Sequence, residues 1–311
     1  MDAGNIGDQV DPRAALAALG YEETSEPQRI TGGWDTLLWR FDTPDGRQHS
    51  LRIYLLPDRE KVCRREEIAL RACESHNLPA PRVEAVGRVQ ETPAAALSWC
   101  PGRPILSFVE KQPWAVLRLS RLFGRAQAQM HAVPPPPELA AGAPGAWLSR
   151  AGPEYRHLAD HMSALSPSTD AFIHMDYHPL NLISDGRDVT GIIDWGGAAA
   201  GDRRADLART YITLVTAPVP PGPMSLLLNF MRSVMLWAWR RGYEELAGPM
   251  PDFRPYRAWA AATLLAELEA VIDRPGVWGT QKDAENLRRK ITLWARQSGQ
   301  PLAPASLPTA R

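Results

Sequence analysis

Hydrophobic and polar positions in the N-terminal third of the chain follow two different periods. Apolar-rich runs over 36–43 and 48–56 are separated by a Pro-Asp-Gly-Arg segment, which predicts two antiparallel strands joined by a hairpin turn. Residues 58–77 place single apolar side chains among dense charges, a pattern typical of an amphipathic helix. The apolar run over 94–100 predicts a buried strand. Together these elements predict a small unit in which a helix packs on an antiparallel sheet.

Beyond residue 103 the pattern becomes mainly helical. An amphipathic run over 113–133 begins with proline and is followed by consecutive prolines, so we expect a helix to start and stop there. Short strand-like runs interrupt the helices at 171–175, 181–186 and 189–195, and an Asp-Gly pair joins the last two. Further helices are expected over 206–214, 224–239, 256–272 and 282–296.

The expected fold is therefore α+β and consists of two lobes, a small sheet lobe and a larger helical lobe. An N-terminal antiparallel sheet lobe covers residues 1–103, and a mainly helical C-terminal lobe covers residues 104–311. Of the 311 residues, 44% are hydrophobic and 23% are charged. These proportions are typical of a globular protein that buries a sizeable core.

The charge balance argues against several classes of partner. Lys and Arg total 35, as do Asp and Glu, so nothing indicates nucleic acid or a membrane as a partner. No run reaches about 18 consecutive apolar residues, and the acidic N-terminus lacks the apolar core of a signal peptide. The cysteines Cys63, Cys73 and Cys100 form no Cys-x-x-Cys pair, which favours a reducing compartment. We expect a cytoplasmic protein, either a monomer or a homodimer.

The segment HMDYHPLNLI, which begins at His174, concentrates polar side chains between apolar runs. One interpretation is a metal site, because His174, Asp176 and His178 would share one face of a strand, with Asp194 joining from a later segment. A second is a polar loop with a structural histidine. A third is a phosphoryl-transfer loop, in which Asp176 accepts the proton of a substrate hydroxyl while Asn181 and Asp194 hold a metal. The hairpin pattern supports the third, since Asn181 begins one predicted strand and Asp194 ends its partner.

The order of the motifs resembles the aminoglycoside phosphotransferase family, whose relatives are the choline kinases and, more distantly, the protein kinases. The family pattern is a His-x-Asp-x-x-x-x-Asn loop, then Ile-Asp-Trp, then Gly-Asp and Asp-Leu-Ala; HMDYHPLN, IIDW, GD and ADLA follow in that order here. The resemblance implies a protein-kinase-like fold, ATP or GTP as phosphate donor and a small hydroxylated molecule as acceptor. It also implies that Asp176 is catalytic and that Asn181 and Asp194 are ligands of Mg²⁺.

The resemblance extends to the predicted sheet lobe. Gly32 and Gly33 lie where the family has a nucleotide-binding loop, and glycine lets backbone N–H groups approach phosphates. Glu66 occupies the acidic helix position that pairs with a basic strand residue. The segment LSWCPGRPI resembles the hinge between lobes and implies that Ser98 and Cys100 lie at the nucleotide.

The basic strand position departs from the common family pattern. Arg52 stands where a phosphate-binding Lys is usual; arginine is always charged and engages phosphate oxygens bidentately, but its reach differs from that of lysine. Among the supporting residues, the resemblance implies that His174 holds the loop by hydrogen bonds. It implies that Asp206 braces the same loop, although capping of the helix over 206–214 explains this aspartate as well. His178 receives no role.

The sequence indicates less about the acceptor molecule than about the fold or the phosphate donor. Residues 201–311 contain 15 Lys and Arg against 10 Asp and Glu, a net charge of +5, which argues mildly against a polycationic substrate. Glu269 and Asp273 share one helix face and are candidates for an acidic patch, while Trp278 is a candidate pocket wall. Antibiotics such as macrolides, aminoglycosides or peptide antibiotics, and hydroxylated metabolites, all stay open as acceptors, with antibiotic resistance as one expected role.

Two other functional classes compete with the kinase. The first is a kinase-like nucleotide-binding protein with little or no turnover, which the unusual Arg52 favours. The second is a metallohydrolase, which would bind a transition metal and no nucleotide.

Overall fold

The computed structural model describes residues 10–30, 36–55, 58–272 and 279–300, which fall into two units. The first, called the sheet unit, comprises Met1–Arg103 and Leu182–Ala198, and the second, called the helical unit, comprises Pro104–Asn181 and Ala199–Arg311. The segment 182–198, expected in the C-terminal lobe, thus groups with the N-terminal sheet. The assignment of nucleotide binding to 1–103 and of catalysis to 104–311 stays a prediction.

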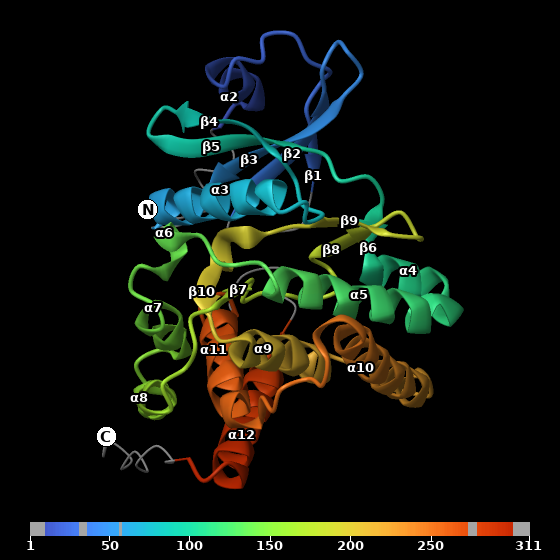
Figure 1. Ribbon diagram of the computed structural model, residues 1–311. Helices are drawn as coiled ribbons and strands as arrows, with labels where there is room; N and C mark the ends of the chain where they lie inside the picture. The colour runs from blue at the N-terminus through green and yellow to red at the C-terminus, as the bar shows by residue number, and fades with distance from the viewer. Residues whose placement is uncertain (1–9, 31–35, 56–57, 273–278, 301–311) are drawn as a thin grey trace, which may run out of the picture. The chain divides into compact units, whose positions relative to one another are not determined.

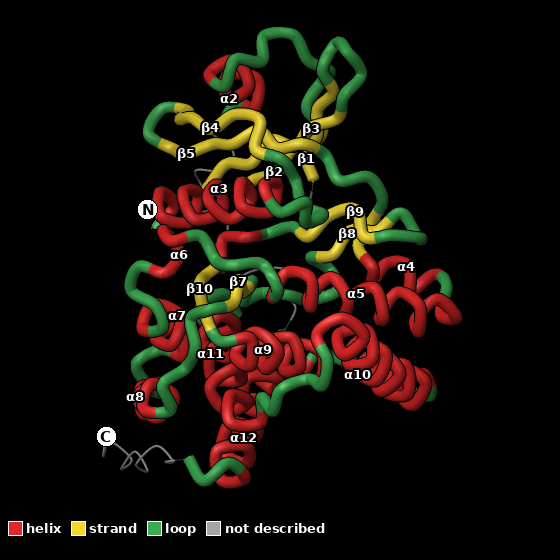
Figure 2. Tube along the Cα trace, viewed as in Figure 1, coloured by secondary structure: helices red, strands yellow, loops and turns green. Residues whose placement is uncertain are grey.

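A five-stranded antiparallel sheet forms the centre of the sheet unit, in the order β1-β2-β3-β5-β4 (Figures 1 and 2). The hairpin predicted over 36–56 is confirmed, since its two strands pair from Thr36↔Tyr54 to Asp42↔Gln48 around a turn in which Gly46 has a φ of 78°. The strands are β1 (Gln28–Ile30), β2 (Thr36–Asp42), β3 (Gln48–Tyr54), β4 (Val83–Val89) and β5 (Thr92–Ser98).

The two faces of this sheet are covered by different helices, α2 (Pro12–Ala18) and α3 (Arg59–Ser75), as Figure 1 shows. Leu51 and Ile53 of β3 pack with Leu16 of α2 in one apolar cluster. Because side chains alternate along a strand, the neighbouring Arg52 and Tyr54 lie on the opposite face, where both hydrogen-bond to α3. The alternation in β3 therefore presents two polar side chains to α3.

A second hairpin, β8 (Leu182–Ser184) and β9 (Val189–Ile192), belongs to the sheet unit. It pairs antiparallel with Leu182 opposite Ile192, and a short 3₁₀ turn η3 (Trp195–Gly197) follows. Gly191 makes close packing possible, because a Cβ there would lie 2.3 Å from the Cys100 sulfur. The hairpin is thus fixed against the chain segment that follows β5.

Helices dominate the helical unit, and α5 and α10 lie side by side in it (Figure 1). Their backbones approach closely at two glycines: a Cβ on Gly124 would lie 2.0 Å from the Trp239 carbonyl oxygen, and one on Gly242 would lie 2.0 Å from that of Arg121. The helices are α4 (Ile105–Lys111), α5 (Val116–His131), α6 (Pro137–Ala140), α7 (Gly145–Leu148), α8 (Arg156–Ala164), α9 (Arg203–Thr216), α10 (Met224–Ala247), α11 (Arg257–Glu269) and α12 (Gln281–Gln297). Shorter elements are β6 (Arg103–Pro104), at the division between the units, β7 (Ala171–Ile173), β10 (Ala199–Gly201), and the 3₁₀ turns η1 (Pro113–Ala115), η2 (Ser149–Ala151) and η4 (Arg254–Tyr256).

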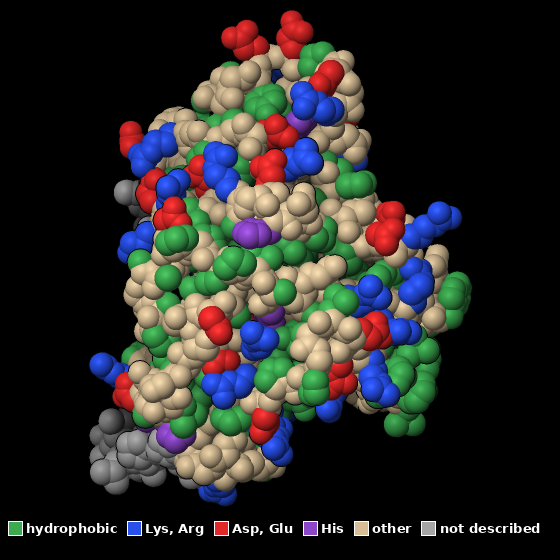
Figure 3. All heavy atoms as spheres, viewed as in Figure 1, with side chains coloured by type: hydrophobic (Ala, Val, Ile, Leu, Met, Phe, Trp, Pro, Cys, Tyr) green, Lys and Arg blue, Asp and Glu red, His purple; other side chains and the backbone are tan. Residues whose placement is uncertain are grey.

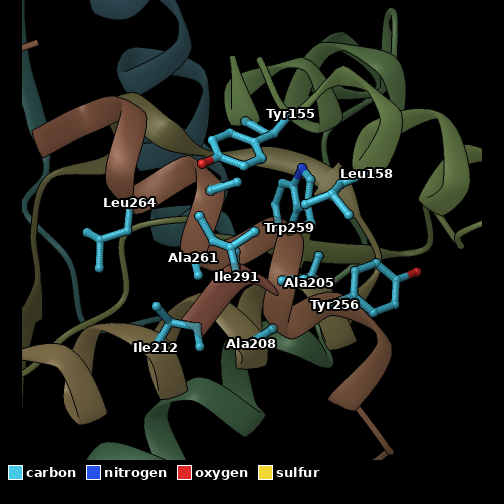
Figure 4. Packing of buried hydrophobic residues seen from close by; sticks show 14 of the residues in the cluster. Tyr155, Leu158, Ala205, Ala208, Ile212, Tyr256, Trp259, Ala261, Leu264 and Ile291 are labelled. Carbon is cyan, nitrogen blue, oxygen red and sulfur yellow. The ribbon is translucent and has the colours of Figure 1, made fainter. Parts of the chain in front are cut away.

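The core of the helical unit gathers side chains from α8, α9, α11 and α12 (Figure 4). Trp259 is fully buried there, stacks edge-on against Trp147 and donates a hydrogen bond to the Leu148 carbonyl at 2.9 Å. Trp259 therefore belongs to the hydrophobic core, as expected for most tryptophans at helical spacing. Trp237 is different, because 56% of it is exposed on α10; Figure 3 shows hydrophobic side chains gathered over this helix.

Within the described residues, no helix is both long and apolar enough to cross a membrane.

Candidate active site

The loop after β7 has an unusual backbone that two side chains hold in place. Met175 is fully buried and has a φ of 70°, a left-handed conformation that is costly for a residue with a side chain. Its N–H donates to Asp206 Oδ1 at 2.5 Å, and the next N–H, that of Asp176, donates to His174 Nδ1 at 3.2 Å. These two bonds fix the direction in which the chain enters Asp176.

Asp206 is the buried centre of a polar network in the helical unit. Besides Met175 N–H, its carboxylate contacts Gln127 Nε2 at 2.9 Å and His131 Nε2 at 3.1 Å, while His131 Nδ1 lies 3.1 Å from the Tyr243 hydroxyl. Burial opposes ionisation of Asp206, but the hydrogen bonds from His131 and Gln127 outweigh it and lower the pKa of this carboxyl. Asp206 is therefore ionised at neutral pH.

The expectation that Asp206 caps its helix is wrong. Helix α9 begins three residues earlier, at Arg203, and its N-cap is Asp202, whose side chain accepts a hydrogen bond from Arg204 N–H. Asp206 therefore lies inside the helix, where its side chain is turned inward to the loop at Met175.

Asp176 combines partial exposure with several polar neighbours. Its side chain is 42% exposed; Oδ2 lies 3.4 Å from His178 Nε2, and Oδ1 lies 3.9 Å from Arg209 Nη2. Burial opposes the charge of Asp176, but His178, Arg209 and His174 outweigh it and hold the pKa of this carboxyl well below its usual range. The structure thus places an ionised, accessible carboxylate in the predicted catalytic position, with His178, which the sequence left without a role, beside it.

Asn181 lies against the same carboxylate. Its Nδ2 donates to the Asp176 main-chain oxygen at 3.0 Å and to Asp176 Oδ2 at 3.1 Å. The amide nitrogen is thereby directed to Asp176, and no hydrogen bond from the described residues engages the Asn181 Oδ1. An amide oxygen of this kind suits a hard cation.

Arg209 and Glu267, which the sequence did not single out, complete the surroundings of Asp176. Arg209 Nε donates to the Met175 carbonyl at 3.0 Å, and Nη2 donates to both carboxylate oxygens of Glu267 at 2.8 and 2.7 Å. Arg209 stands three positions after Asp206 in the ADLART segment, so it is one helical turn away on the same face of α9. That spacing is the signal that could have found it.

Arg52 is the centre of a second cluster, in the sheet unit. Its Nη1 donates to Glu66 Oε1 at 2.5 Å and its Nη2 to Asp194 Oδ1 at 2.9 Å, while the Tyr54 hydroxyl donates to Glu66 Oε2 at 2.6 Å. Burial opposes the charge of Arg52, but the Glu66 and Asp194 carboxylates outweigh it and raise the pKa of the guanidinium. The structure thus brings together three of the residues predicted to handle the nucleotide and its metal.

Asp194 differs from Glu66 in accessibility. Its side chain is 45% exposed, compared with 2% for Glu66, and its φ of 67° is left-handed. The backbone N–H of the following Trp195 donates to Glu66 Oε1 at 3.2 Å, which fixes the strained turn. Asp194 therefore presents a carboxylate at a defined place in the sheet unit.

The structure describes three of the remaining predicted residues. Ser98 Oγ accepts a hydrogen bond from Arg82 N–H at 2.8 Å, and burial raises the pKa of the Cys100 thiol to about 12. Glu269 pairs with Arg288 of α12. Gly32, Gly33, Asp273 and Trp278 lie outside the described residues.

The metal-site interpretation of the histidine segment has no support in the geometry. His174 is fully buried, and its Nδ1 accepts a hydrogen bond from the backbone. Across the described part of the chain, no group of three or more His, Cys, Asp or Glu side chains is arranged to hold a metal ion.

Several solved structures share this fold. A thermostable mutant of aminoglycoside phosphotransferase APH(4)-Ia in ternary complex with ADP and hygromycin B matches with a TM-score of 0.61 at 16% identity, covering 92% of this chain and 98% of that one. Amicoumacin kinase hAmiN, in complex with AMP-PNP, Ca²⁺ and Ami, matches with a TM-score of 0.61 at 12% identity over 95% and 96% of the two chains. Plasmodium vivax ethanolamine kinase matches with a TM-score of 0.59 at 12% identity over 94% and 87%. At these identities the likeness shows the fold, and it confirms the predicted α+β class with an antiparallel sheet followed by a mainly helical region.

Sequence comparison identifies the family directly. No curated protein matches the chain significantly, but the sequence model of the phosphotransferase enzyme family matches residues 26–244, more than half of the chain. This protein therefore belongs to the phosphotransferase enzyme family.

Proposed function

We propose that the protein transfers the terminal phosphoryl group of ATP or GTP to a hydroxyl group of a small molecule. The observation that carries the proposal is the state of Asp176: it is ionised, 42% exposed and held in a fixed loop by hydrogen bonds. Phosphoryl transfer needs little covalent help from the protein, because positioning and charge stabilisation supply most of the catalysis. A fixed carboxylate that orients the attacking hydroxyl and accepts its proton meets this need.

Arg52 is the proposed phosphate-binding cation. Its guanidinium is always charged and is held by Glu66, as the lysine of kinases is held by a glutamate. Arginine can offer two parallel N–H groups to phosphate oxygens, but here one terminal nitrogen already engages Asp194. Nucleotide binding is therefore expected to require some rearrangement of this contact.

The oxygen donors of the site suit Mg²⁺, which prefers carboxylate and amide oxygens. Asn181 contributes an amide Oδ1, and Asp194 contributes its Oδ2, since its Oδ1 accepts from Arg52. We propose these two residues as magnesium ligands. When bound, Mg²⁺ would neutralise charge on the nucleotide phosphates.

For the acceptor, the geometry favours a neutral or weakly charged molecule. The carboxylates of Glu267 and Glu269 on α11 each pair with an arginine, Arg209 and Arg288 respectively, so neither is an uncompensated charge. A polycation would find little net negative charge here. Hydroxylated metabolites and macrolide-like antibiotics are therefore the first candidates, and an antibiotic acceptor would imply a role in resistance.

A nucleotide-binding protein without turnover is the second candidate function. The observation that favours it is the 2.9 Å contact between Arg52 Nη2 and Asp194 Oδ1, because a salt bridge to one oxygen of this carboxylate lowers its affinity for a metal at the other. In that case nucleotide would bind and no phosphoryl group would move.

One experiment separates the two functions. Thermal unfolding is followed with ATP and GTP, each with and without Mg²⁺, and ADP or GDP release is then measured against a panel that includes erythromycin, hygromycin B and ethanolamine. We expect an acceptor in such a panel to stimulate release, and Asp176→Asn to reduce it by about 100-fold or more while keeping the nucleotide-induced rise in Tm. Nucleotide binding with no stimulated release, and no effect of Asp176→Asn, would instead favour the binding protein.

A further inference from the structure

Arg209 of α9 connects the predicted catalytic loop to helix α11. Its side chain is 3% exposed. Nε donates to the carbonyl oxygen of Met175, which directly precedes Asp176, and Nη2 lies 3.9 Å from Asp176 Oδ1. The same Nη2 donates to both oxygens of Glu267 at 2.8 and 2.7 Å. One buried guanidinium thus contacts the backbone before Asp176, the carboxylate itself and an acid of α11.

The contact with Met175 acts on the position of Asp176. The N–H of Met175 is held by Asp206 and its carbonyl by Arg209, so both polar backbone groups of this left-handed residue are bound to α9. A helix is a rigid support for a functional group. The place of Asp176 therefore depends on two side chains that stand one helical turn apart on α9.

The contact with Glu267 affects how close the positive charge of Arg209 lies to Asp176. Arg209 Nη2 is about 1 Å closer to the Glu267 oxygens than to Asp176 Oδ1, and a short, doubly hydrogen-bonded pair is stronger than a contact at 3.9 Å. Glu267 therefore keeps the guanidinium from closing fully onto Asp176. If Glu267 carried no charge, the nearest carboxylate left for Arg209 would be Asp176.

Stability alone explains this arrangement poorly. Buried ion pairs often add little net stability, because desolvation offsets the attraction. Moreover, Arg209 Nη1 is buried without a hydrogen-bond partner among the described residues, which adds to the cost of burying this guanidinium. Glu267, by contrast, keeps 45% of its side chain exposed.

We propose that Arg209 is a positioning residue for the phosphoryl transfer, and that Glu267 sets how closely Arg209 approaches Asp176. The inference rests on the proposed function, since it assigns both residues to the same reaction. Neither residue needs to touch the substrate. Arg209 holds the Met175 carbonyl and thereby the loop, and Glu267 holds Arg209 and thereby the distance between its guanidinium and the Asp176 carboxylate.

The test compares Arg209→Met, Arg209→Lys and Glu267→Gln, singly and with Arg209→Met and Glu267→Gln combined. Glu245→Gln is the matched control, because Glu245 of α10 also accepts two hydrogen bonds from one arginine, Arg121 of α5. Turnover of MgATP is measured with water as acceptor and with the acceptor of the panel that stimulates nucleotide release most, and kcat and the KM for MgATP are determined separately. Circular dichroism and Tm report the folded fraction of each variant.

Expected results follow from the two contacts. Arg209→Met lowers kcat by about 100-fold, the effect of misplacing a catalytic group by about 1 Å. Arg209→Lys recovers part of this loss, because lysine restores the positive charge but lacks the planar, forked guanidinium of arginine. Glu267→Gln lowers kcat by about 10-fold with an unchanged KM for MgATP, as expected when only the reacting carboxylate is affected. In the Arg209→Met background, Glu267→Gln has no further effect, because Glu267 acts through Arg209. Glu245→Gln leaves kcat unchanged.

Each contrary outcome has a distinct meaning. If Arg209→Met and Glu267→Gln lower Tm but leave kcat per folded molecule at the wild-type value, both residues are merely structural and the inference is overturned. It is equally overturned if Glu267→Gln still lowers kcat in the Arg209→Met background. If the wild-type protein releases no ADP with water or with any acceptor of the panel, the proposed function fails, and the inference fails with it. A wild-type protein that turns over while Arg209→Met and Glu267→Gln match it leaves the proposed function standing and removes only the inference.

Discussion

Replacing Arg52 with Lys tests how the sheet unit holds the carboxylates of Glu66 and Asp194. Arg52 uses separate nitrogens for Glu66, Asp194 and Thr36. A lysine ammonium keeps the positive charge, but it is a single point on a flexible stem and lacks the planar fork. At least one charge-assisted hydrogen bond is therefore lost, and each is worth about 1.5–3 kcal/mol.

The comparison with Arg52→Met sets the upper limit of the effect. Methionine removes the charge and leaves Glu66, whose side chain is 2% exposed, without its cation. Loss of one partner of a buried ion pair costs about 3–5 kcal/mol. We therefore expect the free energy of unfolding to decrease from wild type to Arg52→Lys and to decrease further in Arg52→Met.

Urea unfolding followed by circular dichroism measures these differences, provided that the slope of the unfolding free energy against urea concentration is the same in all variants. Arg88→Lys is the matched control, because Arg88 also bridges to an acid of α3, Glu60, but both side chains are about half exposed. Exposed pairs contribute about 0–1 kcal/mol. If Arg52→Lys and Arg88→Lys lower stability equally, Arg52 does not hold the two carboxylates.

Three further predictions concern other parts of the chain. Asp206→Asn should be less stable than wild type at pH 7, and this difference should shrink as pH falls below about 4. The reason is that a carboxyl whose pKa is lowered on folding contributes stability above its unfolded pKa and loses that contribution as pH falls towards its folded pKa. Urea unfolding at several pH values measures the difference, and a pH-independent difference would contradict the prediction. Trp259→Ala should lower stability by about 3–5 kcal/mol, as large truncations in a packed core do, whereas a loss below about 1 kcal/mol would mean that the core is loosely packed. Burial raises the pKa of the Cys63 thiol to about 11 and that of Cys100 to about 12, so thiol reagents at pH 8 should label these residues only after unfolding, and rapid labelling of the native protein would refute this.

The predictability of the fold differs from one strand to another. The hairpin of β2 and β3 was predictable because its strands are apolar and an Asp-Gly pair marks the turn. Strand β4 was not, because alternate residues along it are exposed and the rest are only half-buried, so the stretch lacks a clear apolar stripe. Its strand state comes from pairing with β5, a tertiary effect that a local pattern does not contain.

The same distinction applies to the site. Asp176 and Asn181 are five positions apart and do contact each other, which the spacing of the motif made predictable. Arg209 and Glu267 are 58 positions apart, and they meet because α9 packs on α11. No pattern in either helix indicates that packing. The motif and the family resemblance therefore pointed to Asp176, Asn181 and Asp206, but neither indicated the pairing of Arg209 with Glu267.

The two units share one arrangement of charges, although their folds are unrelated. In each, an arginine with little exposed surface lies between a glutamate and an aspartate with a proposed function: Arg52 between Glu66 and Asp194, and Arg209 between Glu267 and Asp176. The arrangements differ in accessibility, because the Glu66 side chain is 2% exposed and that of Glu267 is 45% exposed. Breaking a fully buried ion pair leaves an uncompensated buried charge, whereas water can solvate an exposed carboxylate. Loss of Arg52 is therefore expected to lower the free energy of unfolding by more than loss of Arg209's contact with Glu267.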